Sequence, residues 1–167
     1  TISFTPFLDP YCNAWRMCAN QSYDGVINGD QWRAGVGKGF NESQWKAFFD
    51  YSEPQSYASF ILRYATLAQR AGADEYYVSH ELVNAVRDGP VEGWEKLVAA
   101  VRAIFKGSVA TALNWGPFVT SSPQQIVPTW LHVLDYVGID CYFPNRNFKN
   151  PDPRPWVLPS LQDMKDG

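Results

Sequence analysis

The sequence has no run of basic residues and no hydrophobic run long enough to cross a bilayer. Its 167 residues include 14 Lys and Arg against 17 Asp and Glu, which gives a net charge of −3. A nucleic-acid groove needs clustered Lys and Arg, and a transmembrane helix needs about 20 consecutive apolar residues. We therefore expect neither nucleic acid nor a membrane among the partners of this protein.

The sequence also has few of the features that bind cofactors. Its two histidines, His80 and His132, are isolated, and no metal-ligand spacing accompanies either of them. The glycine-rich segment 35–39 lacks the preceding strand and the following helix of a phosphate-binding loop. No serine nucleophile elbow is visible. We expect no metal and no cofactor.

Cysteine is scarce, with three residues in the chain. Cys12 and Cys18 lie in a polar, loop-like region and form either a short disulfide or two unpaired thiols, while Cys141 is expected to be a small buried apolar residue in a strand. Glycosylation sequons occur at Asn20 and Asn41 in the same loop region. Together these features favour a Cys12–Cys18 disulfide in a secreted or extracellular glycoprotein.

Helical and extended patterns alternate along much of the chain, which is rich in aromatic residues (16%). The apolar spacing predicts strands at 2–8, 75–79, 109–115 and 136–142, and helices at 57–71, 92–106 and 126–134. The segment 11–53 is a long loop, of a length that is usually functional, with room for a short helix at 43–51. The tail 145–167 is irregular, although a helix could begin at Pro159.

The spacing of these elements indicates an α/β fold. Strands that recur roughly every 30 residues, with helices between them, are typical of βαβ units and a parallel sheet. Such a sheet is either a small doubly wound sheet or part of a (β/α)8 TIM barrel. A whole barrel needs about 250 residues, so this chain would contain about half of one. We interpret residues 1–167 as a single partial barrel domain.

One acidic residue follows a predicted buried strand. Glu81 comes directly after Tyr76 to His80, and helix patterns precede and follow this strand. In barrel enzymes the catalytic groups lie at the carboxyl ends of the strands. The alternative is a solvated glutamate at the end of a strand, and position alone does not decide between the two.

A series of segments spread over residues 1–144 follows a pattern known from one enzyme family. The segments are Trp32-Arg33, the helix 57–71 that leads into His80-Glu81-Leu82, then Ala112 to Trp115, and finally Leu134 to Pro144. They resemble glycoside hydrolase family 113, whose characterised members include β-1,4-mannanases, and are similar to the related barrel domains of phage-like particles. The resemblance implies a (β/α)8 barrel that the chain enters at strand three and leaves after strand six.

The resemblance also implies roles for the matched residues. Glu81 matches the general acid/base that ends strand four, whereas the family's nucleophile ends strand seven, to which nothing in this chain corresponds. His80 departs from the wider clan, in which many members have Asn before the acid/base. Trp32 and Arg33 match a substrate-side loop. Four further residues match positions that line the substrate cleft: Asn114, Trp115, Asp140 and Tyr142.

Each of these side chains also has a structural role open to it. Asp140, and with it Asp9 at the end of the first strand, could orient a sugar hydroxyl or accept a structural hydrogen bond. Arg33 could bind a sugar hydroxyl, although an ion pair with Asp9 or Asp140 is the favoured interpretation. Trp115 and Tyr142 could stack on pyranose rings or pack in the core.

The resulting functional hypothesis is a glycoside hydrolase. Hydrolysis generally needs two carboxylates, one of which is kept protonated by burial or by a nearby negative charge. Glu81, near Asp140, can meet this condition. We predict hydrolysis of a β-linked polysaccharide, mannan-type by resemblance, with Glu81 as general acid/base. The alternative is a non-catalytic glycan-binding protein or a structural component of an extracellular assembly.

A half-barrel has a structural consequence for its partners. Its two open sheet edges expose unpaired backbone groups, which favours association with other chains. We therefore expect the remainder of the barrel, or another protein chain, to cover those edges.

Overall fold

The computed structural model describes residues 1–7, 33–114 and 127–140. Several predicted features lie outside these ranges: the Cys12–Cys18 pair, Asn20, Cys141, the tail 145–167, and four candidate site residues, Asp9, Trp32, Trp115 and Tyr142. In the part that is described, no helix is both long and apolar enough to cross a membrane.

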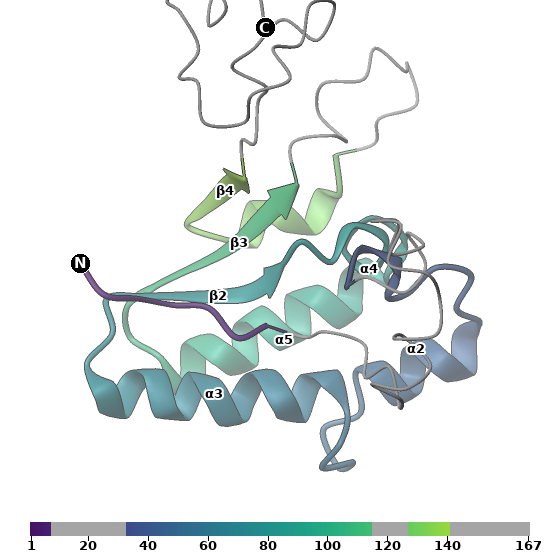
Figure 1. The fold of residues 1–167 in the computed structure, drawn as a ribbon. Coiled ribbons are helices and arrows are strands. Elements are labelled where there is room, and N and C mark those ends of the chain that lie inside the picture. The colour runs from purple at the N-terminus through teal and green to yellow at the C-terminus, as the bar shows by residue number, and fades with distance from the viewer. Residues whose placement is uncertain (8–32, 115–126, 141–167) are drawn as a thin grey trace, which may run out of the picture.

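Four strands form one parallel sheet in the order β1-β2-β3-β4. They are β1 (Ser3–Phe4), β2 (Glu75–His80), β3 (Ser108–Asn114) and β4 (Tyr136–Asp140). Figure 1 shows α3 (Tyr57–Ala71) and α5 (Val91–Ile104) side by side against one face of the sheet. A parallel sheet with connecting helices is the arrangement that the sequence predicted.

The helix α3 forms as its sequence dictates. The Ser56 side chain accepts a hydrogen bond from the backbone N–H of Ser59 and caps the amino end. Gly72 ends the helix in the left-handed conformation, with φ 71°, that favours glycine. One stripe of the helix, including the fully buried Ile61 and Ala65, faces the core. The predicted bounds 57–71 are confirmed.

The two faces of the sheet differ in character. Tyr76, whose hydroxyl donates to the carbonyl of Ile61 in α3, marks the outer face, which packs against the helices. The inner face carries Tyr77 and Tyr136, whose hydroxyls lie 3.1 Å apart. Nearer the carboxyl ends of the strands, the inner face is lined by small residues, among them Ala112 and its register partner Gly138.

Two tryptophans anchor α4 (Val83–Asp88), the short helix that follows β2. Trp94 and Trp130 are fully buried, and their rings stack with centroids 4.6 Å apart. Their indole N–H groups donate to two successive carbonyls of α4, those of Ala85 and Val86, both at 3.0 Å. Because α4 begins two residues after Glu81, this anchor also fixes the end of β2.

Some predicted elements differ from the structure. The first strand, expected at 2–8, is the two-residue β1, and the expected helix at 126–134 is the 3-10 helix η2 (Thr129–Val133). The described part of the long loop contains η1 (Arg33–Gly35) and α2 (Glu42–Phe48). The helix α4 was not predicted, because six residues are too few to show a helical period.

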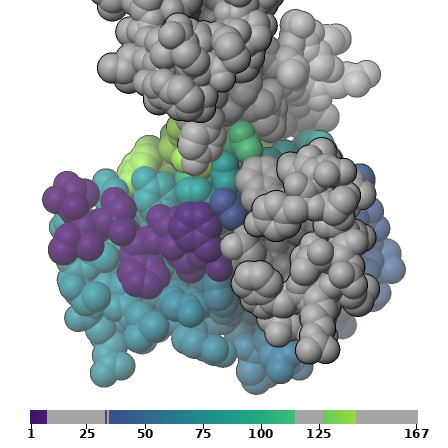
Figure 2. Space-filling model, viewed as in Figure 1, coloured from purple at the N-terminus to yellow at the C-terminus, as the bar shows by residue number. Residues whose placement is uncertain are grey.

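Figure 2 shows residues 1–7 at the surface of the molecule.

Candidate active site

Glu81 lies immediately beyond the carboxyl end of β2, as predicted. It is 3% exposed, and its backbone N–H donates to the carbonyl of Ala112 on the neighbouring strand at 2.9 Å. Its φ of 53° is the one positive value at a non-glycine residue within the described ranges. Such a backbone costs about 1 kcal/mol or more and is concentrated at functional sites. The fold therefore buries a carboxylate at a strand tip and keeps it there in a strained conformation.

Arg33 forms an ion pair with Glu81. Its Nη2 and Nε lie 2.7 and 3.1 Å from the same carboxylate oxygen, Oε2. The two side chains are 16% and 4% exposed, so the pair is largely shielded from water. An ion pair with Asp9 or Asp140 was expected for Arg33; among the described residues its acidic partner is Glu81 and not Asp140, and Asp9 lies outside them. A charge-assisted contact of this kind is strong and directional.

The segment that carries Arg33 is packed tightly against α4. Gly37, at φ +89°, has no room for a side chain: a Cβ there would lie 2.7 Å from Trp45 Cη2 and 2.9 Å from Ala85 Cα. Only glycine combines this backbone conformation with so close an approach. Because α4 follows Glu81 directly, this contact fixes Arg33 and Glu81 relative to each other.

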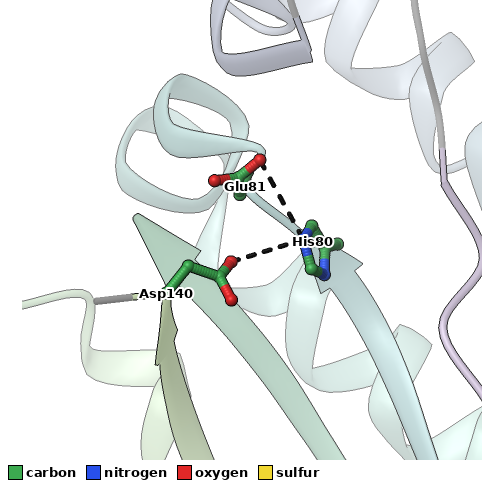
Figure 3. Close-up of side chains that lie close together, drawn as sticks. All are labelled: His80, Glu81 and Asp140. Atoms are coloured by element: carbon green, nitrogen blue, oxygen red, sulfur yellow. Dashed lines mark ion pairs between the residues drawn. The ribbon is translucent and has the colours of Figure 1, made fainter. Parts of the chain in front are cut away.

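His80 lies between two carboxylates (Figure 3). Its Nε2 is 3.3 Å from Asp140 Oδ2 at the tip of β4 and 3.9 Å from Glu81 Oε2. The sequence-based view of His80 as an isolated histidine was therefore wrong, because the parallel register brings β4 level with the end of β2. Within the described part of the chain, neither His80 Nδ1 nor Asp140 Oδ2 has a hydrogen-bond partner, although both atoms are buried.

The three residues His80, Glu81 and Asp140 could offer ligands to a cation. One potential ligand atom from each lies within 4.8 Å of the others. However, the guanidinium of Arg33 already neutralises Glu81 at 2.7 Å and would repel a divalent ion. The charges therefore favour an acid–base site over a metal site.

Phe7 is a site residue that the sequence reasoning did not identify. Its ring centroid lies 4.3 Å from that of His80, and the Arg33 guanidinium carbon lies 5.0 Å above the ring. The ring is half exposed. The signal that could have found it is the one that found Glu81, since Phe7 also lies near the end of a predicted strand.

The described candidate residues lie together at the carboxyl end of the sheet. His80 lies between Asp140 and Glu81, and Glu81 pairs with Arg33. Asn114 is the register partner of Asp140 at the tip of β3. In the chemistry of such a cluster, Glu81 can exchange a proton, and the neighbouring polar groups can bind hydroxyl groups. Whether the remaining candidates join the cluster lies outside the described residues.

Comparison with known proteins gives a family and a fold. The family model described as Glycoside Hydrolase Family 113 matches residues 25–156. Among solved structures, two have TM-scores of 0.51 at 23% identity: a GH113 β-1,4-mannanase and the GH113 β-mannanase AaManA from Alicyclobacillus acidocaldarius in complex with ManMIm. Each similarity covers 68% of this chain and 33% of the other. A third, a complex structure of a GH113 β-1,4-mannanase, has a TM-score of 0.50 at 23% identity.

This chain corresponds to only part of each of these structures. The third similarity covers 71% of this chain and 35% of the other, so the chain spans about a third of the length of these structures. The search of curated proteins gave no match. The family match and the structural similarity confirm the predicted fold class: the parallel sheet and its helices are part of a (β/α)8 barrel.

Proposed function

Because the chain belongs to glycoside hydrolase family 113, we propose that it supplies the proton-transferring half of a barrel enzyme that hydrolyses a β-linked mannan. Glu81 is the general acid/base in this proposal. The structures that it resembles are described as β-mannanases, one of them in complex with ManMIm. The substrate class is taken from those proteins, and the role of Glu81 from the geometry of this chain.

The observation that carries the proposal is the burial of one carboxylate at a strand tip beside polar groups from neighbouring strands. Glu81 is almost fully buried, and only one of its oxygens, Oε2, contacts Arg33 and His80. A proton donor to a glycosidic oxygen needs such a placement, since a leaving alkoxide must be protonated as the bond breaks. Asn114 and Asp140, at the tips of β3 and β4, are proposed to bind sugar hydroxyls.

The test compares the complete protein with its Glu81→Gln variant. Removal of a general acid lowers the rate by about 100-fold or more, so the variant is expected to lose hydrolysis of β-1,4-mannan by at least that factor. Release of reducing sugar measures it. The matched control is Glu92→Gln, which changes an exposed carboxylate on α5 that pairs with Lys96. Near-normal turnover by Glu81→Gln would exclude the proposed role.

A second substrate separates proton donation from a purely structural role of Glu81. An aryl mannoside with a dinitrophenolate leaving group needs little protonation as its bond breaks. If Glu81 is the acid, the Glu81→Gln variant retains bond cleavage on this substrate, which is seen as a burst of phenolate, while it loses hydrolysis of mannan. Equal losses on both substrates would indicate that the substitution has damaged the fold or the binding site instead.

The alternative is a barrel that binds glycan without hydrolysing it. The Arg33–Glu81 ion pair favours this alternative, because a buried carboxylate that already binds a guanidinium at 2.7 Å has a structural role open to it. Retention of the complete protein on immobilised mannan, with no soluble product and no effect of Glu81→Gln, would support the binding protein. The same binding accompanied by product release supports the enzyme.

We also propose that the protein is secreted and glycosylated. Asn41 is exposed and caps α2: its Oδ1 accepts from the Gln44 backbone N–H at 3.0 Å and from the Ser43 hydroxyl at 2.7 Å. A glycan on the amide nitrogen would leave this capping oxygen in place. Mass loss on deglycosylation of protein secreted by a eukaryotic host, together with blocked thiols at Cys12 and Cys18, would support the proposal.

A further inference from the structure

Phe7 places an exposed aromatic ring at the carboxyl end of the sheet. Phe4 in β1 is the register partner of Tyr76 in β2, so Phe7, three residues further along the chain, lies level with the end of β2. Its ring centroid is 4.3 Å from that of His80, yet Phe7 is 50% exposed. A ring that is open to solvent therefore lies beside a residue that contacts Glu81.

The exposure of Phe7 differs from the use of large aromatic residues in the core. Four of these residues are at most 2% exposed: Tyr76, Trp94, Phe105 and Trp130. Single exposed rings are normal on protein surfaces and do not by themselves indicate a binding site. Phe7 becomes informative through its neighbours, because its ring lies next to two side chains that also contact the carboxylate of Glu81.

These two neighbours hold the ring close to the buried carboxylate. The guanidinium carbon of Arg33 lies 5.0 Å from the ring centroid of Phe7, and Arg33 Nη2 is 2.7 Å from Glu81 Oε2. His80 Nε2 is 3.9 Å from the same oxygen. The attraction between a cation and an aromatic ring adds to the packing that orients Phe7. A ring that is already oriented loses little conformational freedom on binding, and a ligand that covered it would lie beside Glu81.

The chemistry of this position matches a sugar ring. Phenylalanine has no polar side-chain atom, so it contacts a ligand through the ligand's apolar surface. A pyranose has C–H groups on its faces, which pack on an aromatic ring, and hydroxyl groups around its rim. Asn114 and Asp140, register partners at the tips of β3 and β4, supply polar groups for those hydroxyls at the same end of the sheet.

We propose that Phe7 is a substrate-binding residue whose ring stacks on the C–H face of a pyranose bound next to Glu81. This inference rests on the proposed function for the identity of the sugar, a β-linked mannan. It requires binding and not hydrolysis, so it holds for the enzyme and for the glycan-binding alternative. The competing role is structural: the ring supports Arg33 and His80 and does not touch the sugar.

The first measurement is the dissociation constant of β-1,4-mannohexaose for the complete protein, determined by calorimetry in the Glu81→Gln background, which prevents turnover. Phe7→Leu removes the aromatic ring but retains an apolar side chain, and we expect it to raise Kd about threefold to tenfold. Phe7→Tyr retains the ring and should bind like the parent Glu81→Gln protein. The matched control is Tyr51→Leu, which removes a 42% exposed aromatic ring between α2 and α3 and should leave Kd unchanged.

The second measurement separates contact with the sugar from structural support. The ring current of a stacked aromatic ring moves the NMR signals of the sugar protons above it upfield. We expect these shifts with Phe7 and with Phe7→Tyr, and their loss in Phe7→Leu. Phe7→Met is a second non-aromatic replacement, in case the leucine variant does not fold. Weaker binding with unchanged sugar shifts would assign the ring a supporting role and overturn the inference, as would an unchanged Kd.

Failure of this inference differs from failure of the proposed function. If Glu81→Gln retains hydrolysis of mannan, Glu81 is not the acid, and the effect of Phe7→Leu is then measured as the KM for mannan instead of Kd. If Glu81→Gln is inactive but Phe7→Leu changes neither Kd nor the sugar shifts, Glu81 remains the acid and Phe7 does not bind the sugar. Absence of mannohexaose binding by the parent protein would overturn the substrate class and this inference together.

Discussion

Glu81 and Arg33 show how a single residue pair depends on backbone conformation as well as on side-chain chemistry. The left-handed backbone at Glu81 aims its carboxylate toward η1, and Gly37 lets the segment that carries Arg33 approach α4 closely enough to reach it. The side chains supply the charges, but the positive φ values at Glu81 and Gly37 determine which charged groups come into contact. Gly37 is therefore as necessary to the geometry of the site as Arg33 is.

We expect Gly37→Ala to destabilise the protein and Gly39→Ala to do so much less. Both glycines have positive φ, +89° and +69°, so alanine is strained at either position. A Cβ at Gly37 would also overlap Trp45 and Ala85, whereas nothing lies within 4 Å of one at Gly39. The expected losses are about 2 kcal/mol or more for Gly37→Ala and about 1 kcal/mol for Gly39→Ala.

Urea denaturation of the two glycine variants measures this difference. Gly39→Ala is the matched control, because it carries the backbone strain without the overlap. Equal losses of unfolding free energy would show that the η1 segment does not pack closely on α4. The geometric support for the Arg33–Glu81 pair would then be lost as well.

The sequence predicts which residues form the site better than it predicts their partners. Glu81 and Asp140 were found because both lie at the ends of predicted strands, and parallel register alone brings strand ends together. The choice of Glu81 over Asp140 as the partner of Arg33 depends on one φ angle, which residue types do not encode. His80 was dismissed as isolated, since its neighbour Asp140 is 60 positions away in the chain.

At the level of elements, two tyrosine hydroxyls join α3 and β2, one donating a hydrogen bond from the helix to the strand and the other from the strand to the helix. Tyr57 in α3 donates to the carbonyl of Val78 in β2, and Tyr76 in β2 donates to that of Ile61 in α3, both at 2.7 Å. Each phenol is buried, and each bond satisfies a buried polar group. The helix and the strand are therefore fixed to each other at two points.

Burial raises the pKa of Tyr57 and of Tyr76 above the ordinary value. A raised pKa in the folded state means that the protonated form stabilises the fold. This stability is fully present below about pH 10, the ordinary value for tyrosine, and is lost as the pH rises further. We expect the free energy of unfolding to fall steeply above that pH.

Tyr57→Phe and Tyr76→Phe test this origin of the alkaline loss. Each variant gives up one hydrogen bond, worth about 1 kcal/mol at neutral pH, but has one phenol fewer to ionise. Their unfolding free energies should therefore decline less than that of the wild type between neutral pH and about pH 11. A decline as steep as in the wild type would assign the alkaline loss to other groups.

Elements were predicted well where they are long enough to show several turns of the helical period. The helix α3 spans four turns with a polar cap and a closing glycine, and its bounds agree with the prediction. The predicted helix 92–106 is the observed α5, Val91–Ile104, shifted by one or two residues at its ends. By contrast, α4 is held by the indoles of Trp94 and Trp130, and such a tertiary cause leaves no local pattern in the sequence.

In the described part of the molecule, helices cover the outer face of β2 and β3, whereas β4 lies at the edge of the sheet. The outer face of β2 and β3 is covered by α3 and α5, and its residues are buried. On β4 the same face carries Val137 and Ile139, register partners of the buried Thr111 and Leu113, and these two are 36% and 46% exposed. A barrel would cover this face with a further helix and pair the open edge of β4 with a further strand.

We expect the polypeptide 1–167 to self-associate through this edge. Open edges and exposed apolar residues favour association between chains. Val137→Lys combined with Ile139→Lys should reduce the association seen by sedimentation velocity. The control is Leu67→Lys, which changes an apolar residue that is 45% exposed on α3, away from the edge. A wild-type polypeptide that sediments as a monomer at tens of micromolar would show that residues of this chain already complete the sheet.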